Sequence, residues 1–413
     1  MEESLYDLIK LSLLGSELTY AVSLMRELGR RKQLDNDEDN EAALQLPMQA
    51  KEFQRIIKAN PKLAGVFESK NEDAMLQFSA IDSVTERNEK AKALTKTVRA
   101  SIRNFQEEMG GGMANDVVGS SGSDALQEIQ LVYFNDQADK GYREQTEMVY
   151  GISVDGVAKR VNVVFRGSRT PADWAANKNF NGLTVPNPVK ELAQFANDAS
   201  LPKEVRIHEG FHEYLHRKDG TEMGTFEILL PILEKNPGYS LFVSGHSLGG
   251  ALASLFAVSA ACRADIPKPV RCITHAQPLV GDKYFLQSVR KLEESNNLLL
   301  LRTRNCEDGV PAVPAFSAKP KFTYTHIGME LKLYDDTRSK NMKLSKSEKR
   351  VKNFALNFKA LIKLFVIQAG KDRQKKAHSL REHLIRIQKN EKAIQSLGDK
   401  LEDLYSKTEN VIM

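Results

Sequence analysis

A short glycine-rich segment between an apolar strand pattern and an apolar helix pattern most restricts how this chain can fold. The segment is Gly245-His246-Ser247-Leu248-Gly249, with a strand-like run at 239–244 before it and a helix-like run to about 264 after it. A strand that turns directly into a helix needs glycines two residues on either side of the turn, because the two backbones pass closely there. The central serine then takes strained dihedrals at a helix N-terminus, where negative charge is favoured. The pattern predicts a reactive serine at Ser247, and an ordinary glycine-rich turn is the alternative.

The surrounding sequence alternates between strand and helix patterns. Apolar runs of strand length occur at 128–134, 147–154, 160–165, 239–244 and 270–276, and the later ones are separated by helical patterns. Such alternation is typical of a largely parallel sheet with helices packed on it. We therefore expect an α/β fold, with a mostly parallel sheet and helices on both faces.

A nucleophilic serine needs a base, and the base needs an acid that orients it. In enzymes built around such a turn, the acid and then the histidine follow the serine in the chain. Asp308 lies in a loop directly after the apolar strand 298–301, and His326 precedes a further strand-like run, so they are the candidate acid and base. A loop-capping aspartate and a buried structural histidine are the alternatives. Four other histidines compete with His326 as the base, namely His208, His212, His246 and His275.

The chemistry of a serine nucleophile also requires donors for the negative oxygen that forms on the attacked carbonyl. One donor is the backbone N–H of the residue after the serine, which is Leu248, and the other comes from the end of an earlier strand. Ser168 follows a strand and Gly167, and it offers both a backbone N–H and a hydroxyl. A simple strand-to-loop turn is the alternative reading of Ser168.

Six segments can be compared with a known family as a set. They are FRGS…DW, VRIHEGF, GHSLGGALASL, AQPLVGD, RNCEDGVPAVP and THIGMEL, within residues 128–335. In order and approximate spacing this set resembles the class 3 lipases, the fungal-type lipase family of α/β hydrolases. The resemblance covers roughly half of the chain.

The resemblance implies an α/β-hydrolase fold and a Ser247–Asp308–His326 triad, with Ser168 and Leu248 as the oxyanion hole. It also implies a lid at 169–205, where apolar residues lie among polar ones, with a permanently packed surface flap as the alternative. No metal and no organic cofactor is needed for this chemistry. The segment AHSLREHLIRI, 377–387, resembles the closing helix of plant-type relatives, which packs on the core.

The charge of the chain is concentrated in one segment. The chain has 59 Lys and Arg against 54 Asp and Glu, a net charge of +5, but residues 338–377 alone hold 13 basic and 2 acidic residues, net +11. Apolar residues at helical spacing in 351–366 predict a basic amphipathic helix, and 341–376 is a candidate contact with an anionic membrane or lipid droplet. A helix packed on the core with a solvated lysine face is the alternative. A nucleic-acid partner is not expected, because the segment lacks interleaved aromatics and a known motif.

Composition and termini restrict the location of the protein. We find no run of about 18 apolar residues, which a membrane-spanning helix requires. Glu2 and Glu3 stand where a signal peptide carries positive charge, and the three cysteines lack metal-ligand spacing. We expect an intracellular protein with reduced thiols, cytoplasmic or peripheral on a membrane or lipid droplet.

The sequence predicts four regions. They are a helical region at 1–110 containing an acidic loop at 35–41, a Gly/Ser-rich linker at 111–127, the α/β-hydrolase core at 128–336 and a basic helical region at 337–413 that packs partly on the core. The expected function is hydrolysis of carboxylic esters of lipids, with acylglycerols as the leading substrates. A phospholipase A1 or a galactolipase shares every catalytic residue and stays open, as does a lipase-like interaction protein without activity.

Overall fold

We analysed a computed structural model of the 413-residue chain. The described residues are 4–60, 129–136, 148–169, 173, 177, 179, 181–216, 224–314, 316–318, 321–334, 342–346, 376–406 and 411–412. The predicted linker at 111–127 and most of the basic segment lie outside these ranges.

The chain divides into two compact units, and its divisions differ from the predicted domain boundaries. Unit 1 comprises residues 1–16, 137–148 and 163–413, and unit 2 comprises residues 17–136 and 149–162. The first 16 residues therefore belong with the predicted hydrolase core, and the first strands of that core belong to unit 2. The long helix α1 (Leu5–Arg30) and the strand β4 (Arg160–Phe165) each have residues in both units.

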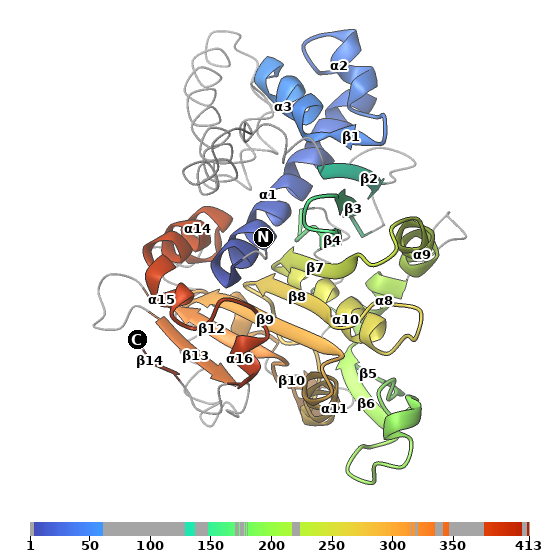
Figure 1. The fold of residues 1–413 in the computed structure, drawn as a ribbon, viewed down its shortest axis with the longest axis vertical. Coiled ribbons are helices and arrows are strands. Elements are labelled where there is room, and N and C mark those ends of the chain that lie inside the picture. The colour runs from blue at the N-terminus through green and yellow to red at the C-terminus, as the bar shows by residue number, and fades with distance from the viewer. Residues whose placement is uncertain are drawn as a thin grey trace. The chain divides into compact units, whose positions relative to one another are not determined.

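Unit 1 is built on a largely parallel sheet, as expected from the alternating pattern. Its strands follow the order β4, β7, β8, β9, β12, β13, β14, and β7 to β12 pair in parallel (Figure 1). Their bounds are β7 (Ser240–His246), β8 (Val270–His275), β9 (Leu298–Asn305), β12 (Met329–Leu333), β13 (Met342–Lys346) and β14 (Val411–Ile412). The two last strands are antiparallel to their neighbours.

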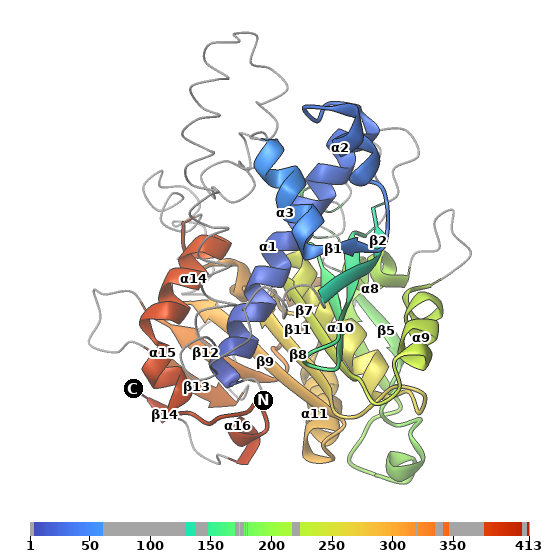
Figure 2. The same cartoon turned by 45° about the horizontal axis from the view of Figure 1, so that its top comes forward.

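Helices cover both faces of this sheet. On one face lie α10 (Leu248–Ala261) and α11 (Lys283–Glu294), and Cys272 Sγ of β8 contacts the Ala253 carbonyl of α10. The next residue of β8, Ile273, points to the other face, where it joins a core with the first part of α1 and with α14 (Leu380–Lys389), α15 (Glu391–Gln395) and α16 (Asp403–Ser406) (Figure 2). Side chains of a strand alternate between faces, so one strand serves both helix layers. The expected α/β-hydrolase architecture is confirmed.

The C-terminal region is not wholly helical, contrary to expectation. Residues 342–346 form β13, which pairs with β12, and β14 near the C-terminus pairs with β13. Alternate residues Met342 and Leu344 are buried in the core, while lysines at 343 and 346 flank them. This period of two favours a strand, and the neighbouring edge of the sheet accepts it. The predicted amphipathic helix at 351–366 lies outside the described residues.

The described part of the predicted lid is a hairpin that packs against α11. Strand β5 (Gly182–Pro186) pairs antiparallel with β6 (Glu204–His208), with the short helix η4 (Ala193–Phe195) between them. Asn187 Nδ2 donates to Ser288 Oγ of α11 at 2.9 Å, and Val189 is fully buried. For residues 182–205 these contacts favour the alternative of a packed flap. The segments 170–172 and 174–176 of the predicted lid are not described.

The remaining elements of unit 1 are short. They are α8 (Glu209–His216), α9 (Thr225–Lys235), η5 (Val310–Ala312) and the antiparallel pair β10 (Phe316–Ala318) and β11 (Lys321–Thr323).

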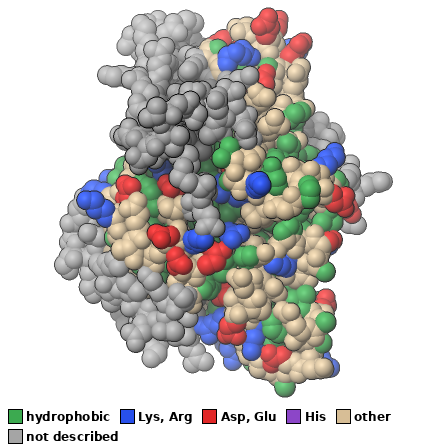
Figure 3. Space-filling view, viewed as in Figure 1, with side chains coloured by type: hydrophobic (Ala, Val, Ile, Leu, Met, Phe, Trp, Pro, Cys, Tyr) green, Lys and Arg blue, Asp and Glu red, His purple; other side chains and the backbone are tan. Residues whose placement is uncertain are grey.

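Unit 2 has its own small core. It contains the end of α1, α2 (Asp37–Ala42), α3 (Ala50–Ala59), β1 (Met48–Gln49), β2 (Ile129–Asn135) and β3 (Tyr150–Asp155). The acidic run predicted as a solvated loop is largely the helix α2, which Asn36 caps by accepting from Asp39 N. Asp39 is fully buried and binds Arg55 and Asn60, while acidic side chains gather on the surface over α2 (Figure 3). Acidic residues suit a first helical turn, which explains why the run is helical.

Helix α1 is long and apolar enough to cross a membrane by length and composition. Its best 18-residue window has a mean hydropathy of 1.3, and 61% of that window is buried within the protein. The sequence prediction considered only uninterrupted apolar runs, whereas α1 reaches this mean hydropathy with polar residues among the apolar ones. A mostly buried helix of this kind also occurs in the cores of globular proteins, and the buried side chains of α1 contribute to both cores.

The predicted strand-to-helix turn is confirmed, and two glycines make it possible. A Cβ on Gly245 would overlap the Gly249 carbonyl, and a Cβ on Gly249 would overlap the Phe165 carbonyl of β4. Both obstacles are backbone atoms, which cannot rotate away as a side-chain tip can. Ser247 between them has φ 58° and ψ −126°, a backbone conformation that is unfavourable for a residue with a Cβ.

We predict that Gly249→Ala destabilises the protein by at least about 2 kcal/mol, because the added methyl forces β4 and α10 apart. Urea unfolding followed by circular dichroism measures this change. Gly224→Ala is the matched control, since a Cβ at Gly224 meets nothing within 4 Å. Equal stability of the two variants would contradict the role assigned to the turn.

Candidate active site

Ser247 lies where β7 ends and α10 begins. Its backbone N–H donates to the His275 carbonyl of the neighbouring strand β8 at 2.9 Å, and its own carbonyl accepts from Gly250 N at 2.9 Å. The serine backbone is thus held by both the sheet and the helix. Its Oγ is presented at the N-terminus of a 14-residue helix, where the first N–H groups have no acceptor within the helix.

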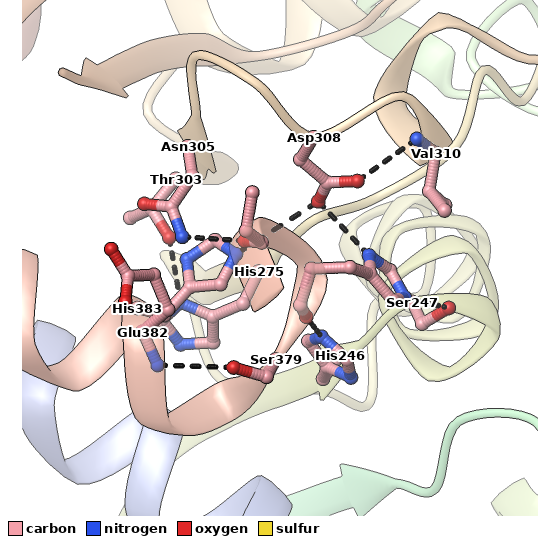
Figure 4. A network of polar contacts seen from close by, with 12 residues as sticks. His246, Ser247, His275, Thr303, Asn305, Asp308, Val310, Ser379, Glu382 and His383 are labelled. Atoms are coloured by element: carbon pink, nitrogen blue, oxygen red, sulfur yellow. Dashed lines mark hydrogen bonds and ion pairs between the residues drawn. The ribbon is translucent and has the colours of Figure 1, made fainter. Parts of the chain in front are cut away.

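A histidine from the C-terminal segment connects Ser247 to Asp308. His378 Nε2 lies 3.0 Å from Ser247 Oγ, and His378 Nδ1 lies 2.9 Å from Asp308 Oδ2. Because a carboxylate only accepts, Nδ1 carries the proton and Nε2 is the acceptor for the serine hydroxyl. The other carboxylate oxygen, Asp308 Oδ1, accepts from Val310 N at 2.9 Å (Figure 4). The structure brings together the predicted nucleophile and acid, joined by a histidine that was not predicted.

The prediction of His326 as the base is corrected by this geometry. His326 Nε2 donates to the Pro311 carbonyl at 2.7 Å, so it supports the loop after Asp308 as a structural histidine. The other ring nitrogen, His326 Nδ1, has no hydrogen-bond partner within the described residues. Neither nitrogen of this ring therefore bonds to Ser247 or Asp308. Burial is the main cause that lowers the pKa of His326 well below 6.5.

The sequence did contain a signal for His378. The segment AHSLREHLIRI begins one residue before it and was interpreted only as a closing helix packed on the core. That helix is α14, capped by Ser379, whose side chain accepts from Glu382 N. His378 directly precedes this cap, so the N-terminus of α14 determines where the imidazole lies. The requirement for a histidine after the acid is met by His378 as well as by His326.

The second predicted oxyanion donor, Ser168, is held in a supported turn after β4. Asn177 Nδ2 donates to Ser168 Oγ at 2.7 Å, which leaves the serine's own hydroxyl proton available to another acceptor. The turn is fixed by buried Asp173, which accepts from Arg169 N at 2.7 Å and pairs with Arg166 at 3.0 Å. Leu248, the other predicted donor, is the first residue of α10.

Three further buried histidines lie around His378. The His246 ring centroid is 4.7 Å from that of His378 and 6.0 Å from that of His383, which is also 6.0 Å from that of His275. Burial lowers the pKa of His275 to about 3, and it is the first cause of pKa values well below 6.5 at His246 and His383. His275 is fixed by Thr303 Oγ1 at 2.7 Å and by Ser12 Oγ of α1 at 2.8 Å. These histidines are therefore neutral at pH 7.

Within the described residues, no group of three or more His, Cys, Asp or Glu side chains could hold a metal ion. The three cysteines are free thiols, and burial raises the pKa of Cys262 to about 12. The arrangement at Ser247 is sufficient for covalent chemistry on a carbonyl carbon. A hydroxyl faces a neutral imidazole, the imidazole faces a carboxylate, and donors lie at the helix N-terminus.

Comparison with known families gives one family match. The model of the family "Lipase (class 3)" matches residues 162–318, which contain Ser168, Ser247 and Asp308. His378 lies 60 residues beyond the matched region.

Comparison with individual proteins gives relatives of two activities. The chain is 29% identical over 210 residues to phospholipase A1-II 3 of Oryza sativa subsp. japonica, covering 46% of this chain and 47% of that protein. It is 29% identical over 181 residues to the lipase of Rhizomucor miehei, covering 43% of each. The chain thus spans less than half the length of these relatives. Among solved structures, lipase II from Rhizopus niveus matches with a TM-score of 0.42 and 21% identity, over 63% of this chain and 90% of that one.

We predict that the free energy of unfolding falls as the pH is lowered from 7 towards 4. Buried His208 has a pKa lowered to about 3 by burial, as has His275, whereas the unfolded chain protonates its histidines near 6.5. Below pH 6.5 the unfolded state therefore binds more protons, and each such histidine removes up to about 1.4 kcal/mol per pH unit. Urea unfolding at several pH values measures the slope.

His208→Gln is the control for this pH dependence. It should lower the slope of the unfolding free energy against pH by the contribution of about one proton, and it leaves the triad unchanged. A free energy of unfolding that stays constant between pH 7 and pH 5 would contradict the assignment of neutral buried histidines.

Proposed function

We propose, on the premise that residues 162–318 match the class 3 lipase family, that the chain is a serine hydrolase that cleaves carboxylic esters of lipids. The observation that carries the proposal is the continuous contact from Ser247 Oγ through both nitrogens of His378 to Asp308. Each atom of that contact is oriented for the transfer of one proton away from the serine.

The reaction follows from these contacts. Ser247 Oγ attacks the ester carbonyl while His378 Nε2 takes its proton, and buried Asp308 holds the imidazole and stabilises its charged form. The negative oxygen is stabilised by Leu248 N–H and by the N–H or hydroxyl of Ser168. His378 returns the proton to the leaving alcohol, and water then hydrolyses the acyl-enzyme by the same route.

Acylglycerols are the first substrates that we propose, and phospholipids and galactolipids are the alternative. The similarity to the Rhizomucor miehei lipase supports the first class, and the equally similar rice phospholipase A1 supports the second. The same triad would serve the hydrolysis of acylglycerols, phospholipids and galactolipids. The choice among these substrates therefore depends on the shape of the site for the acyl chain and the head group.

A lipase-like protein without activity is the competing proposal from another class. It gives no physical reason for the strained conformation of Ser247, with φ 58°, or for a histidine joined to both Ser247 and Asp308. Strain of this kind persists only where the surrounding structure enforces it, and it concentrates at functional sites.

We predict that Ser247→Ala and His378→Gln each lower kcat by roughly 10⁴ to 10⁶, because nucleophile and base act as one unit. His326→Gln should keep kcat within about threefold, since within the described residues its ring bonds to the Pro311 carbonyl and not to Ser247 or Asp308. The assays are ester hydrolysis and covalent labelling by a fluorophosphonate probe. The assignment of the base is wrong if His326→Gln loses activity and His378→Gln keeps it.

The substrate class is tested with the wild-type protein in a fatty-acid release assay. Triacylglycerol emulsion, diacylglycerol, phosphatidylcholine and galactolipid are compared, with Ser247→Ala as the blank. Absence of both release and probe labelling would refute the hydrolase proposal itself and leave the interaction protein.

We propose, further, an intracellular location with peripheral attachment to an anionic membrane or lipid-droplet surface through 341–376. The net charge of +11 in residues 338–377 supports this attachment, since each lysine near an anionic surface contributes about 1 kcal/mol. A deletion of 341–376 would remove β13, so charge neutralisation is the better test.

We expect Gln at the three lysines 352, 359 and 363 to reduce co-sedimentation with anionic phosphatidylserine vesicles at least tenfold, because the charge is lost without loss of β13. Vesicle co-sedimentation at 0.1 M salt measures this change. Equal pelleting of the wild type with neutral and anionic vesicles would count against the attachment site.

A further inference from the structure

The backbone around His378 is held by two side chains that neighbour the other two triad residues. His246 Nε2 lies 2.8 Å from the His378 carbonyl oxygen, and Asn305 Nδ2 donates to the Ala377 carbonyl oxygen at 2.6 Å. Since a carbonyl only accepts, His246 Nε2 is protonated and donates. Figure 4 shows both side chains reaching the same short stretch of chain from different strand ends.

These carbonyls need partners because the chain leaves the helical conformation at this point. Ser379 has φ −68° and ψ 144° and caps α14, so the first N–H groups of that helix are directed to the cap. His383 N donates to the Ser379 carbonyl at 3.1 Å, and Glu382 N donates to Ser379 Oγ at 3.2 Å. The carbonyls of Ala377 and His378 lie before the cap and are supplied with donors by side chains instead.

Both donor side chains also carry a buried polar atom that lowers the stability of the folded protein. Asn305 is fully buried and His246 is 5% exposed, yet Asn305 Oδ1 and His246 Nδ1 have no hydrogen-bond partner in the described structure. A buried polar atom without a partner costs about 1–3 kcal/mol. Apolar side chains of similar size would avoid that cost, so the bonds to the base segment account for the polar residues.

Each donor is also joined through the backbone to one of the other triad residues. His246 directly precedes Ser247, and the Asn305 carbonyl accepts from Asp308 N at 3.2 Å. His246 therefore connects the nucleophile to the base, and Asn305 connects the acid to the base.

We infer that His246 and Asn305, called here the carbonyl clamp, are positioning residues that set the distance of the His378 ring from Ser247 and Asp308. The inference rests on the proposed function, because it assigns a role in the reaction of that triad. His378 lies 131 residues beyond Ser247 in the chain, so its placement has to come from tertiary contacts. A displacement of about 1 Å at a reacting group lowers the rate about 100-fold.

The test uses His246→Phe, Asn305→Leu and the conservative variant His246→Gln, which keeps a donor near the position of Nε2. We expect His246→Phe and Asn305→Leu to lower kcat about 10- to 100-fold with KM within twofold. The rate of fluorophosphonate labelling should fall by a similar factor. For His246→Gln, the logarithm of kcat should lie at least a third of the way from the value of His246→Phe back to that of the wild type.

The matched control is Asn236→Leu, which removes an amide-to-carbonyl bond of 2.7 Å to Ile232, at the end of α9. It should lower the melting temperature without changing kcat. Each rate is divided by the folded fraction of that variant before the variants are compared. Because the clamp has two independent residues, the test still gives an answer if one variant does not fold.

The carbonyl clamp is overturned if folded His246→Phe or Asn305→Leu reacts as fast as Asn236→Leu, or if His246→Gln is as slow as His246→Phe. The proposed function fails by a different result, namely no labelling of the wild-type protein. An active wild type with unaffected clamp variants would therefore reject this inference alone.

Discussion

The close passage of β7, α10 and β4 is the constraint on which the rest of unit 1 depends. Gly245 and Gly249 leave no room for a Cβ, and between them Ser247 is held at φ 58°. The geometry fixes the serine at the carboxyl end of the central strand and at the N-terminus of a buried helix. Asp308 is placed relative to this point, because β8 and β9 continue the parallel register of β7 up to the loop that carries it.

The site is assembled from segments that are far apart in the chain. Ser247 follows β7, Asp308 follows β9, Ser168 follows β4, and His378 comes from the segment before α14. The parallel strands β7 and β9 bring Ser247 and Asp308 to one edge of the sheet, where loops of α/β proteins meet their ligands. The base is different, because its position depends on how α14 packs. That helix and its neighbours share a core with the first part of α1, so both ends of the chain contribute to the framework of the site.

Buried histidines give the site a low-polarity surrounding at neutral pH. His246, His275 and His383 are neutral because burial disfavours their charged form. Neutral rings allow the carboxylate of Asp308 to act mainly on His378, which is the ring that changes charge in the proposed reaction. The same burial makes the protein sensitive to acid, so the local environment that serves the site also limits stability at low pH.

The sequence by itself determined the serine turn, the largely parallel sheet and the resemblance to class 3 lipases, and it singled out Asp308 as the candidate acid. These features depend on local patterns, namely glycine spacing, apolar strands and a loop after a strand. Only the tertiary structure decided which histidine faces the serine. His326 and His378 both follow Asp308 in the chain, and chain order does not distinguish them. His326 is bound to the Pro311 carbonyl, while packing of α14 brings His378 between Ser247 and Asp308. A base that is defined by long-range packing leaves no local pattern, because its partners lie 70 and 131 residues away.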